Sequence, residues 1–193
     1  MRIFAKPLAL LAVLALLLTL AATPARAADT MVQMDTTLGT VLLALDAKAA
    51  PNTVANFLAY VDKGLYTGTV FHRVISGFMV QGGGYDQNLL HRDALPPIKL
   101  ETAAGLENKR GALAMARTND PNSATSQFFI NLVDNAFLNP SPGNPGYAVF
   151  GKVMRGMEVV DAIAKVKTET RGGMKDVPVT PVVITKMSRY QGQ

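Results

Sequence analysis

The chain of 193 residues contains no cysteine, no tryptophan and only two histidines. Without cysteine it can form no disulfide, no thiolate nucleophile and no cysteine–zinc site. His72 and His91 have no carboxylates clustered around them at the spacing that a metal site needs. The G-x-S-x-G motif of serine hydrolases is also missing. The sequence therefore gives no support to nucleophilic or metal-assisted catalysis.

The chain also lacks a strong excess of charge. It has 19 Lys and Arg against 14 Asp and Glu, and no basic run is longer than Lys109-Arg110. Three of the basic residues and none of the acidic ones lie in the first 27 residues, so residues 28–193 carry a net charge of only +2. Such a weak and scattered charge is not the basic patch of a nucleic-acid-binding protein, and we expect no nucleic-acid partner.

Only one long uncharged apolar run is present, over residues 8–20. Arg2 and Lys6 precede it, and the small-residue site Ala25-Arg26-Ala27 follows, which predicts a cleavable signal peptide over residues 1–27. A membrane anchor is the alternative, but the run falls short of the roughly 20 residues that a transmembrane helix needs. No cysteine follows the run, so no lipid can be attached there. We expect an exported protein without a stable membrane anchor after cleavage.

Residues 28–193 form one predicted domain with many short strands and two helices. Alternation of apolar and polar residues around Leu38-Gly39 predicts a hairpin over residues 31–45. Further strands are predicted over residues 70–75, 78–82, 112–116, 127–132, 148–153 and 182–187. Pro51 opens one helix, which Gly64 ends, and a second helix contains Met157, Val160 and Ile163. This pattern favours an all-β fold, a closed or sandwiched sheet, in which the terminal strands could pair.

Alternation along these strands groups large apolar side chains with polar ones. The groups expected to share a face are Phe71, Arg73 and Ile75; Met79 and Gln81; and Gln127 and Phe129. From this pattern alone, Arg73 is either an ordinary surface cation with its stem on apolar atoms or a functional group. His72 fits a structural position within its strand. The glycines at 82–84 indicate a sharp backbone bend at the end of a strand.

Three segments carry a family resemblance. Residues 71–83 read F-H-R-V-I-S-G-F-M-V-Q-G-G, which resembles the cyclophilin signature F-H-R-x-I-x-G-F-M-x-Q-G-G. A second block, residues 111–117 followed by 126–130, resembles the second signature of that family in order and separation. Residues 147–151, Y-A-V-F-G, match a third segment. The resemblance extends over residues 31–188, and two long blocks at matching separation are far more specific than a lone glycine motif.

Resemblance to cyclophilins implies a closed eight-stranded antiparallel β-barrel capped by two α-helices. It also implies a peptidyl-prolyl cis-trans isomerase that needs no metal or cofactor, with Arg73 and Gln81 as the catalytic residues. The substrate-binding residues that it implies are Phe78, Met79, Ala116, Arg117, Gln127, Phe129, Phe137, Leu138 and Tyr147. Among these, Phe78, Met79, Phe129 and Leu138 would form the walls of a pocket for the proline ring.

The same resemblance sets the expected partners. They are proline-containing, unfolded or partly folded exported polypeptides in the periplasm, bound by a monomer. A non-catalytic periplasmic chaperone that grips proline-containing segments is the alternative. Phe137 stands where many eukaryotic cyclophilins have tryptophan and Tyr147 where they have histidine, and both substitutions resemble bacterial members. In members with the tryptophan, its indole N–H donates to the inhibitor cyclosporin, so only weak cyclosporin binding is expected here.

Overall fold

The computed structural model describes residues 30–102 and 105–192. The predicted signal peptide, residues 1–27, lies outside the described residues, and its prediction stands untested. Within the described part of the chain, no helix is long and apolar enough to cross a membrane.

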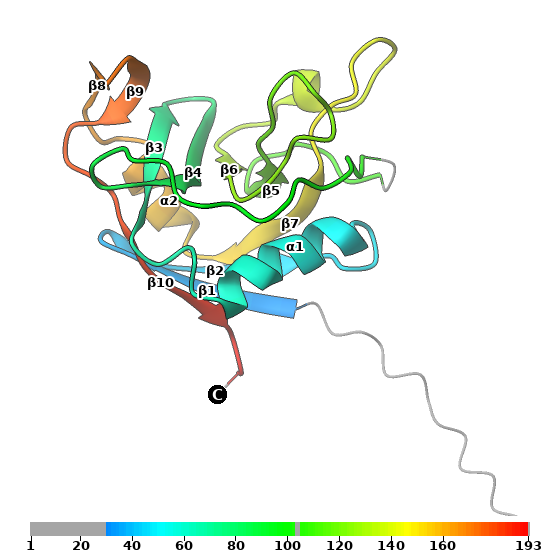
Figure 1. Ribbon diagram of the computed structural model, residues 1–193, viewed down its shortest axis with the longest axis horizontal. Coiled ribbons are helices and arrows are strands. Elements are labelled where there is room, and N and C mark those ends of the chain that lie inside the picture. The colour runs from blue at the N-terminus through cyan, green and yellow to red at the C-terminus, as the bar shows by residue number, and fades with distance from the viewer. Residues whose placement is uncertain (1–29, 103–104, 193) are drawn as a thin grey trace, which may run out of the picture.

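Eight strands form one sheet that nearly closes into a barrel (Figure 1). Their order is β10-β1-β2-β7-β5-β6-β4-β3, and each neighbouring pair in this order is antiparallel. The strands are β1 (Thr30–Thr36), β2 (Gly39–Leu45), β3 (Thr69–Ile75), β4 (Met79–Asp86), β5 (Ala112–Met115), β6 (Phe128–Asn131), β7 (Val149–Arg155) and β10 (Ile184–Arg189). An antiparallel bridge between Val70 and Val183 joins the two ends of this order, supported by a 3.0 Å bond from Phe71 N to Val182 O. The predicted barrel and the pairing of the terminal strands, β1 with β10, are confirmed.

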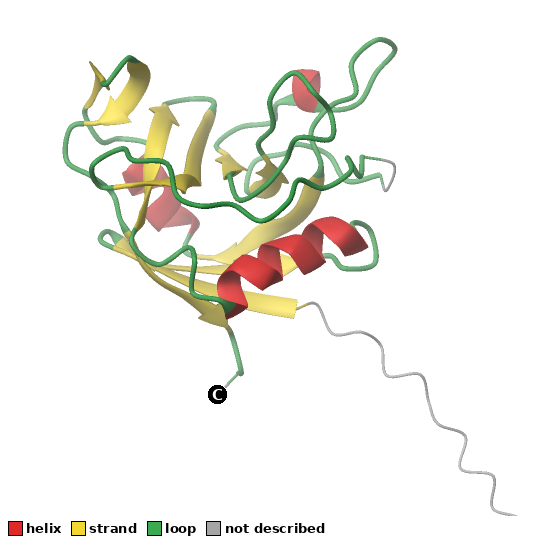
Figure 2. Ribbon diagram, in the orientation of Figure 1, coloured by secondary structure: helices red, strands yellow, loops and turns green. Residues whose placement is uncertain are grey.

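Two helices bury apolar side chains in the barrel interior and occupy separate positions beside the strands (Figure 2). Helix α1 (Pro51–Asp62) has proline in its first turn, where a missing N–H costs nothing, and it buries Val54, Phe57, Leu58 and Val61. The Glu101 carboxylate accepts bonds from Asn52 N and Thr53 N and so satisfies free amides at the start of this helix. Helix α2 (Met157–Ile163) buries Val160 and Ile163. Both predicted helices are therefore confirmed.

The described residues also contain a hairpin that the sequence analysis missed, formed by β8 (Thr168–Arg171) and β9 (Met174–Pro178). Gly172 and Gly173 form its turn and both have positive φ, a conformation that favours glycine. Its residues are mostly polar and half-buried or exposed, so no hydrophobic alternation marks it in the sequence. In Figure 1 the hairpin lies beside β3, the strand that carries Arg73.

Strand β4 does not end at the triple glycine, as predicted, but continues through it to Asp86. The expected bend is present within the strand: Gly83 has φ of +86°. A Cβ on Gly83 would lie 2.9 Å from the Tyr66 ring, and a Cβ on Gly84 would lie 2.5 Å from Cγ of Gln127. These glycines let β4 bend tightly against its neighbours, so the bend was predicted correctly and the end of the strand was not.

Phe71 does not share a face with Arg73 and Ile75, which corrects the simple alternation expected for β3. The pairing of β3 with β4 shifts register between Phe71 and Arg73, so one extra residue interrupts the alternation. Phe71 therefore points into the barrel, where its ring centroid lies 6.2 Å from that of Phe128. Arg73 is exposed on the outer surface, with Ile75 packed against the apolar cluster there.

Candidate active site

A small hollow of about 110 Å³ on the outer face of the barrel brings together most of the predicted site residues. They come from the strands β3, β4 and β6, the end of β5, the turn before β4, the 3-10 helix η1 (Ala136–Leu138) and the loop before β7. The residues lining it are Arg73, Phe78, Met79, Gln81, Ala116, Arg117, Phe129, Leu138 and Tyr147. Segments far apart in the sequence thus meet at one place, and the remaining two predicted residues, Gln127 and Phe137, lie outside the lining.

The floor and walls of this hollow are apolar. Met79, Phe129 and Leu138 are buried and belong to one outer cluster of side chains. The same cluster contains Ala112 and Ala114 of β5, and Ala116 packs against it. Because alanines carry no bulk beyond Cβ, this part of the sheet surface leaves room beside the larger side chains. The hollow suits a compact apolar ring better than a charged group.

Arg73 lies at the edge of the hollow. Its side chain is exposed and, among the described residues, makes no hydrogen bond or ion pair within bonding distance. Across the ladder its partner is Gln81, whose Nε2 donates a 2.9 Å bond to Oε1 of Gln127. Gln127 is therefore tied to the site through Gln81 although it does not line the hollow. The guanidinium keeps all its donors available for a bound molecule.

Phe137 sits on the rim. Two-thirds of its surface is exposed (66%), and its ring stacks on Phe78 with 5.6 Å between centroids and 25° between planes. Phe137 therefore contacts Phe78, which forms a wall of the hollow, and does not itself line the hollow. A ligand larger than a single ring would reach Phe137.

The Arg117 side chain makes structural contacts that the sequence did not indicate. Its Nε donates to Gly146 O at 3.0 Å and its guanidinium lies 4.5 Å from the centre of the Tyr147 ring. Tyr147 in turn meets Phe129 edge-on, with 5.7 Å between centroids. A cation above an aromatic face is attractive, so Arg117 holds Tyr147 against the apolar cluster.

His72 is buried next to Arg73 and packs on Tyr85, with 4.7 Å between ring centroids. Burial lowers the pKa of His72 from 6.5 to about 4, because the charged form would lose its hydration. The imidazole is thus neutral at pH 7. This agrees with the structural role expected for His72.

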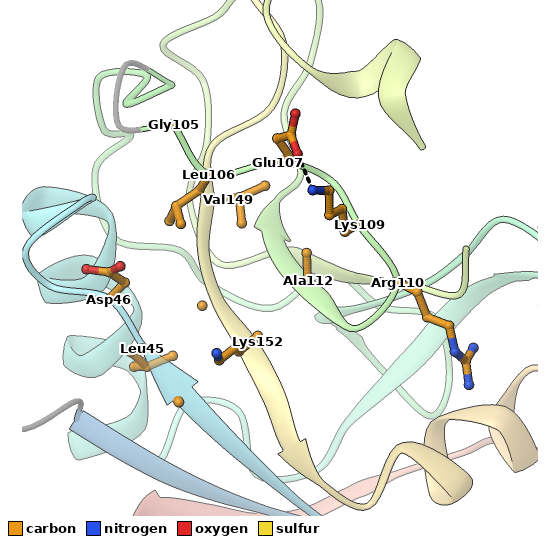
Figure 3. A pocket seen from close by; sticks show the side chains of 12 residues that line it. Leu45, Asp46, Gly105, Leu106, Glu107, Lys109, Arg110, Ala112, Val149 and Lys152 are labelled. Atoms are coloured by element: carbon orange, nitrogen blue, oxygen red, sulfur yellow. Dashed lines mark ion pairs between the residues drawn. The ribbon is translucent and has the colours of Figure 1, made fainter. Parts of the chain in front are cut away.

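A larger hollow, about 320 Å³, lies on the neighbouring part of the sheet between β2, β5, β7 and residues 105–110 (Figure 3). Its rim carries charges of both signs, including the ion pair between Lys109 and Glu107. None of the predicted site residues lines it. Ala112 and Val149 line it and also belong to the apolar cluster that packs behind the small hollow, although none of the described residues lines both hollows.

Comparison with known proteins shows the family to which the chain belongs. A family model described as "Cyclophilin type peptidyl-prolyl cis-trans isomerase/CLD" matches residues 31–189. The chain belongs to the cyclophilin family. Peptidyl-prolyl cis-trans isomerase A of Dickeya dadantii (strain 3937) is 51% identical over 177 residues, covering 91% of this chain and 93% of that protein. Peptidyl-prolyl cis-trans isomerase B of Escherichia coli (strain K12) is 48% identical over 161 residues, covering 82% and 98%.

Solved cyclophilin structures agree. A cyclophilin-type isomerase of Cryptosporidium parvum superposes with a TM-score of 0.71 at 26% identity, covering 86% of this chain and 99% of that one. The same protein crystallised in the presence of the dipeptide Ala-Pro gives a TM-score of 0.70, also at 26% identity, covering 84% and 99%. The protein is therefore a cyclophilin-type peptidyl-prolyl isomerase, an enzyme. This disfavours the alternative of a non-catalytic binding module.

Proposed function

We propose that this isomerase holds the proline ring of its substrate in the small outer hollow, with the Arg73 guanidinium beside the prolyl nitrogen. The observation that carries the proposal is the meeting, at one point of the sheet, of an apolar hollow and a guanidinium that has no partner among the described residues. The hollow is lined by Phe78, Met79, Phe129 and Leu138, and it fits one small ring. The solved relative crystallised with Ala-Pro gives a precedent for a proline-containing ligand in this family.

The chemistry follows from amide resonance. Rotation about a peptide bond costs about 18–20 kcal/mol because the C–N bond has partial double-bond character. X–Pro bonds populate both isomers but interconvert in roughly tens to hundreds of seconds unaided.

In the twisted transition state the conjugation is lost, and the prolyl nitrogen gains a lone pair that can accept a hydrogen bond. A guanidinium donor placed there binds the twisted state more tightly than either planar state, which is what accelerates the reaction. Arg73 suits this role because arginine stays charged and presents a rigid fork of donors. No proton transfer or covalent intermediate is needed.

An NMR titration tests where the substrate binds. A short peptide containing Ala-Pro should shift the methyl signal of Met79 and the ring signals of Phe129. The methyl signals of Leu45, which lines the larger hollow, should stay unchanged. A peptide with alanine in place of proline is the control and should shift neither. Shifts at Leu45 without shifts at Met79 would move the binding site away from Arg73.

We also propose that the enzyme is exported and acts on proline-containing exported polypeptides in the periplasm, as a monomer. The support is the charged start, apolar run and Ala25-Arg26-Ala27 site of residues 1–27. N-terminal sequencing of the protein from a periplasmic extract should give Ala28 as the first residue. A protein that still begins with Met1 contradicts export, and a dimer mass in sedimentation equilibrium contradicts the monomer.

A further inference from the structure

Three asparagines are buried beside the small hollow: Asn108 at 1% exposure, Asn131 at 0% and Asn135 at 3%. Asn131 is the last residue of β6 and lies two residues after Phe129, so its side chain projects from the same outer face. Asn135 lies just before the 3-10 helix η1, and Asn108 lies before β5. Buried amides need partners for all their polar atoms, so their bonds define what they hold in place.

Their side chains form one directional chain of hydrogen bonds. Nδ2 of Asn135 donates to Oδ1 of Asn131 at 2.7 Å. Nδ2 of Asn131 donates to Oδ1 of Asn108 at 3.2 Å and to Ala112 O at 3.3 Å. Nδ2 of Asn108 then donates to Oδ1 of Asn139 at 3.0 Å. Each of the three buried side chains thus donates a hydrogen bond to the next asparagine in the series, which ends at Asn139.

The two ends of this chain are fixed to the walls of the hollow. At one end, Nδ2 of Asn135 also donates to Phe78 O at 3.0 Å. At the other, Nδ2 of Asn108 also donates to Leu138 O at 3.2 Å, an oxygen that accepts from Tyr147 N at 3.0 Å as well. Phe78, Leu138 and Tyr147 all line the hollow, and all three lie outside the strands.

We propose that Asn108, Asn131 and Asn135 are positioning residues for catalysis, which fix the distance between the Phe78 and Leu138 walls of the substrate hollow. Met79 and Phe129 are held by the strand ladder, whereas Phe78 and Leu138 belong to a turn and a single helical turn. Backbone bonds already hold both positions, from Leu132 N to Phe78 O and from Leu138 N to Asn135 O, each at 2.9 Å, and the asparagine side chains link these two positions to one another. Both side-chain N–H groups of Asn108, Asn131 and Asn135 donate hydrogen bonds, so only one orientation of each of these three amides satisfies them all.

The proposal rests on the proposed function of the hollow and makes a kinetic prediction. The proline ring occupies the same walls in the planar and twisted states, so weakening the walls loosens both states alike. Asn135→Ala should therefore raise KM for an Ala-Pro peptide by about fivefold or more and leave kcat within about twofold. A residue that only supported folding would lower the active fraction and leave KM unchanged.

Thr69→Val is the matched control. Thr69 is fully buried and donates to Tyr66 O at 2.6 Å, away from the hollow. It should lose stability without a change in KM. Asn108→Ala cuts the opposite end of the chain and should raise KM like Asn135→Ala, with the double variant showing less than the product of the two effects. Phe78→Ala reports on the wall itself and should also raise KM.

A measurement on the wild type covers the case in which the variants do not fold. Addition of the Ala-Pro peptide should shift the side-chain amide proton signals of Asn135 and Asn108. The side-chain amide of Asn52, which bonds Glu101 at 2.7 Å far from the hollow, should stay unchanged. If Phe78→Ala raises KM but a folded Asn135→Ala does not, or if these amide signals do not respond, the positioning role is wrong. If Phe78→Ala leaves KM unchanged, the proposed substrate hollow itself is wrong.

Discussion

The two faces of the barrel sheet are built from the same strands and differ in what they carry. Along β5, Leu113 and Met115 point inward while Ala112 and Ala114 point outward. Along β6, Phe128 and Ile130 point inward while Phe129 points outward. The inner face packs large side chains on all sides together with both helices. The outer face mixes small side chains with a few large ones and leaves a hollow.

This difference separates stability from function along a single strand. An inner side chain is surrounded by protein, so its loss leaves a cavity. An outer side chain such as Phe129 is also largely buried, at 4% exposure, but it packs in the smaller outer cluster and its remaining surface lines the hollow. Adjacent residues should therefore respond differently to the same substitution, and each prediction below tests that division.

Phe128→Ala should give the largest effect. The Phe128 ring is fully buried and meets Phe57 and Tyr66 at 5.5 Å and Phe71 at 6.2 Å between centroids, all edge-on. Removing it should lower the free energy of unfolding by about 3–5 kcal/mol. Urea unfolding measures this loss.

The neighbouring Phe129→Ala is the comparison, because that ring lines the hollow. It should lower stability by less than Phe128→Ala, and reduce kcat/KM of the folded enzyme by at least about tenfold. Equal losses of stability with no change in kcat/KM would contradict the division between the two faces.

Arg73→Ala should show the opposite balance. Loss of the donor to the prolyl nitrogen should reduce kcat/KM by about 10²–10³, mostly through kcat. Because Arg73 is exposed and unpaired among the described residues, the free energy of unfolding should change by less than about 1 kcal/mol. Matched turnover and melting curves test both halves. Near-normal turnover of the folded variant would refute the role assigned to Arg73.

His72 lies on the outer face, but Tyr85 packs against it and it is buried. Like an inner residue, it should therefore affect stability. Its pKa is about 4 in the folded protein and 6.5 ordinarily, so between these values the unfolded chain binds a proton that the folded protein does not. Its contribution to stability is fully present above pH 6.5 and is lost as the pH falls toward 4, by up to about 3 kcal/mol. Unfolding measured across this window should show the slope in the wild type, and His72→Phe should flatten it. The same slope in both proteins would assign it to other groups.

The sequence, through its resemblance to cyclophilins, predicted the barrel, both helices and all nine residues that line the hollow. Contiguous signatures around Arg73 and Phe129 carry that information, and strand alternation identifies faces wherever the ladder is regular. It failed at Phe71, because a register shift reverses the face and leaves no mark in the residue types. It also missed the β8–β9 hairpin, whose residues are largely polar and bury little.

The hydrogen-bonded chain of asparagines beside the hollow was also not predicted from the sequence. Asn108, Asn131 and Asn135 are polar residues in or near loops, where asparagine usually belongs to a turn. Only the folded chain brings them together under the hollow. One signal was available in the sequence. Asn131 follows Phe129 by two positions in a predicted strand, which places both side chains on the same face of the sheet.

The smallest predicted effect on stability concerns an outer side chain that is mostly exposed. Phe137 is 66% exposed and contacts Phe78, so replacing it should leave stability nearly unchanged. In cyclophilins with tryptophan here, resemblance implies an indole N–H bond to a carbonyl of cyclosporin, and phenylalanine has no such donor. One neutral hydrogen bond contributes about 0.5–1.5 kcal/mol, and the smaller ring loses further contact area.

Together these differences should weaken cyclosporin binding by about 1.5–3 kcal/mol, or roughly 10- to 150-fold. A short substrate should not need that donor, because in the proposed binding mode its proline ring occupies the hollow lined by Phe129 and Leu138, which Phe137 does not line. We therefore expect an active enzyme that cyclosporin inhibits weakly, and Phe137→Trp should raise the affinity at least about tenfold without changing kcat/KM. Tyr147, held by Arg117 at 4.5 Å, narrows the neighbouring wall and limits the gain. Titration of both proteins with cyclosporin, followed by turnover, measures the difference. Tight inhibition of the wild type, or no gain in Phe137→Trp, would show that the rim residue does not set cyclosporin affinity.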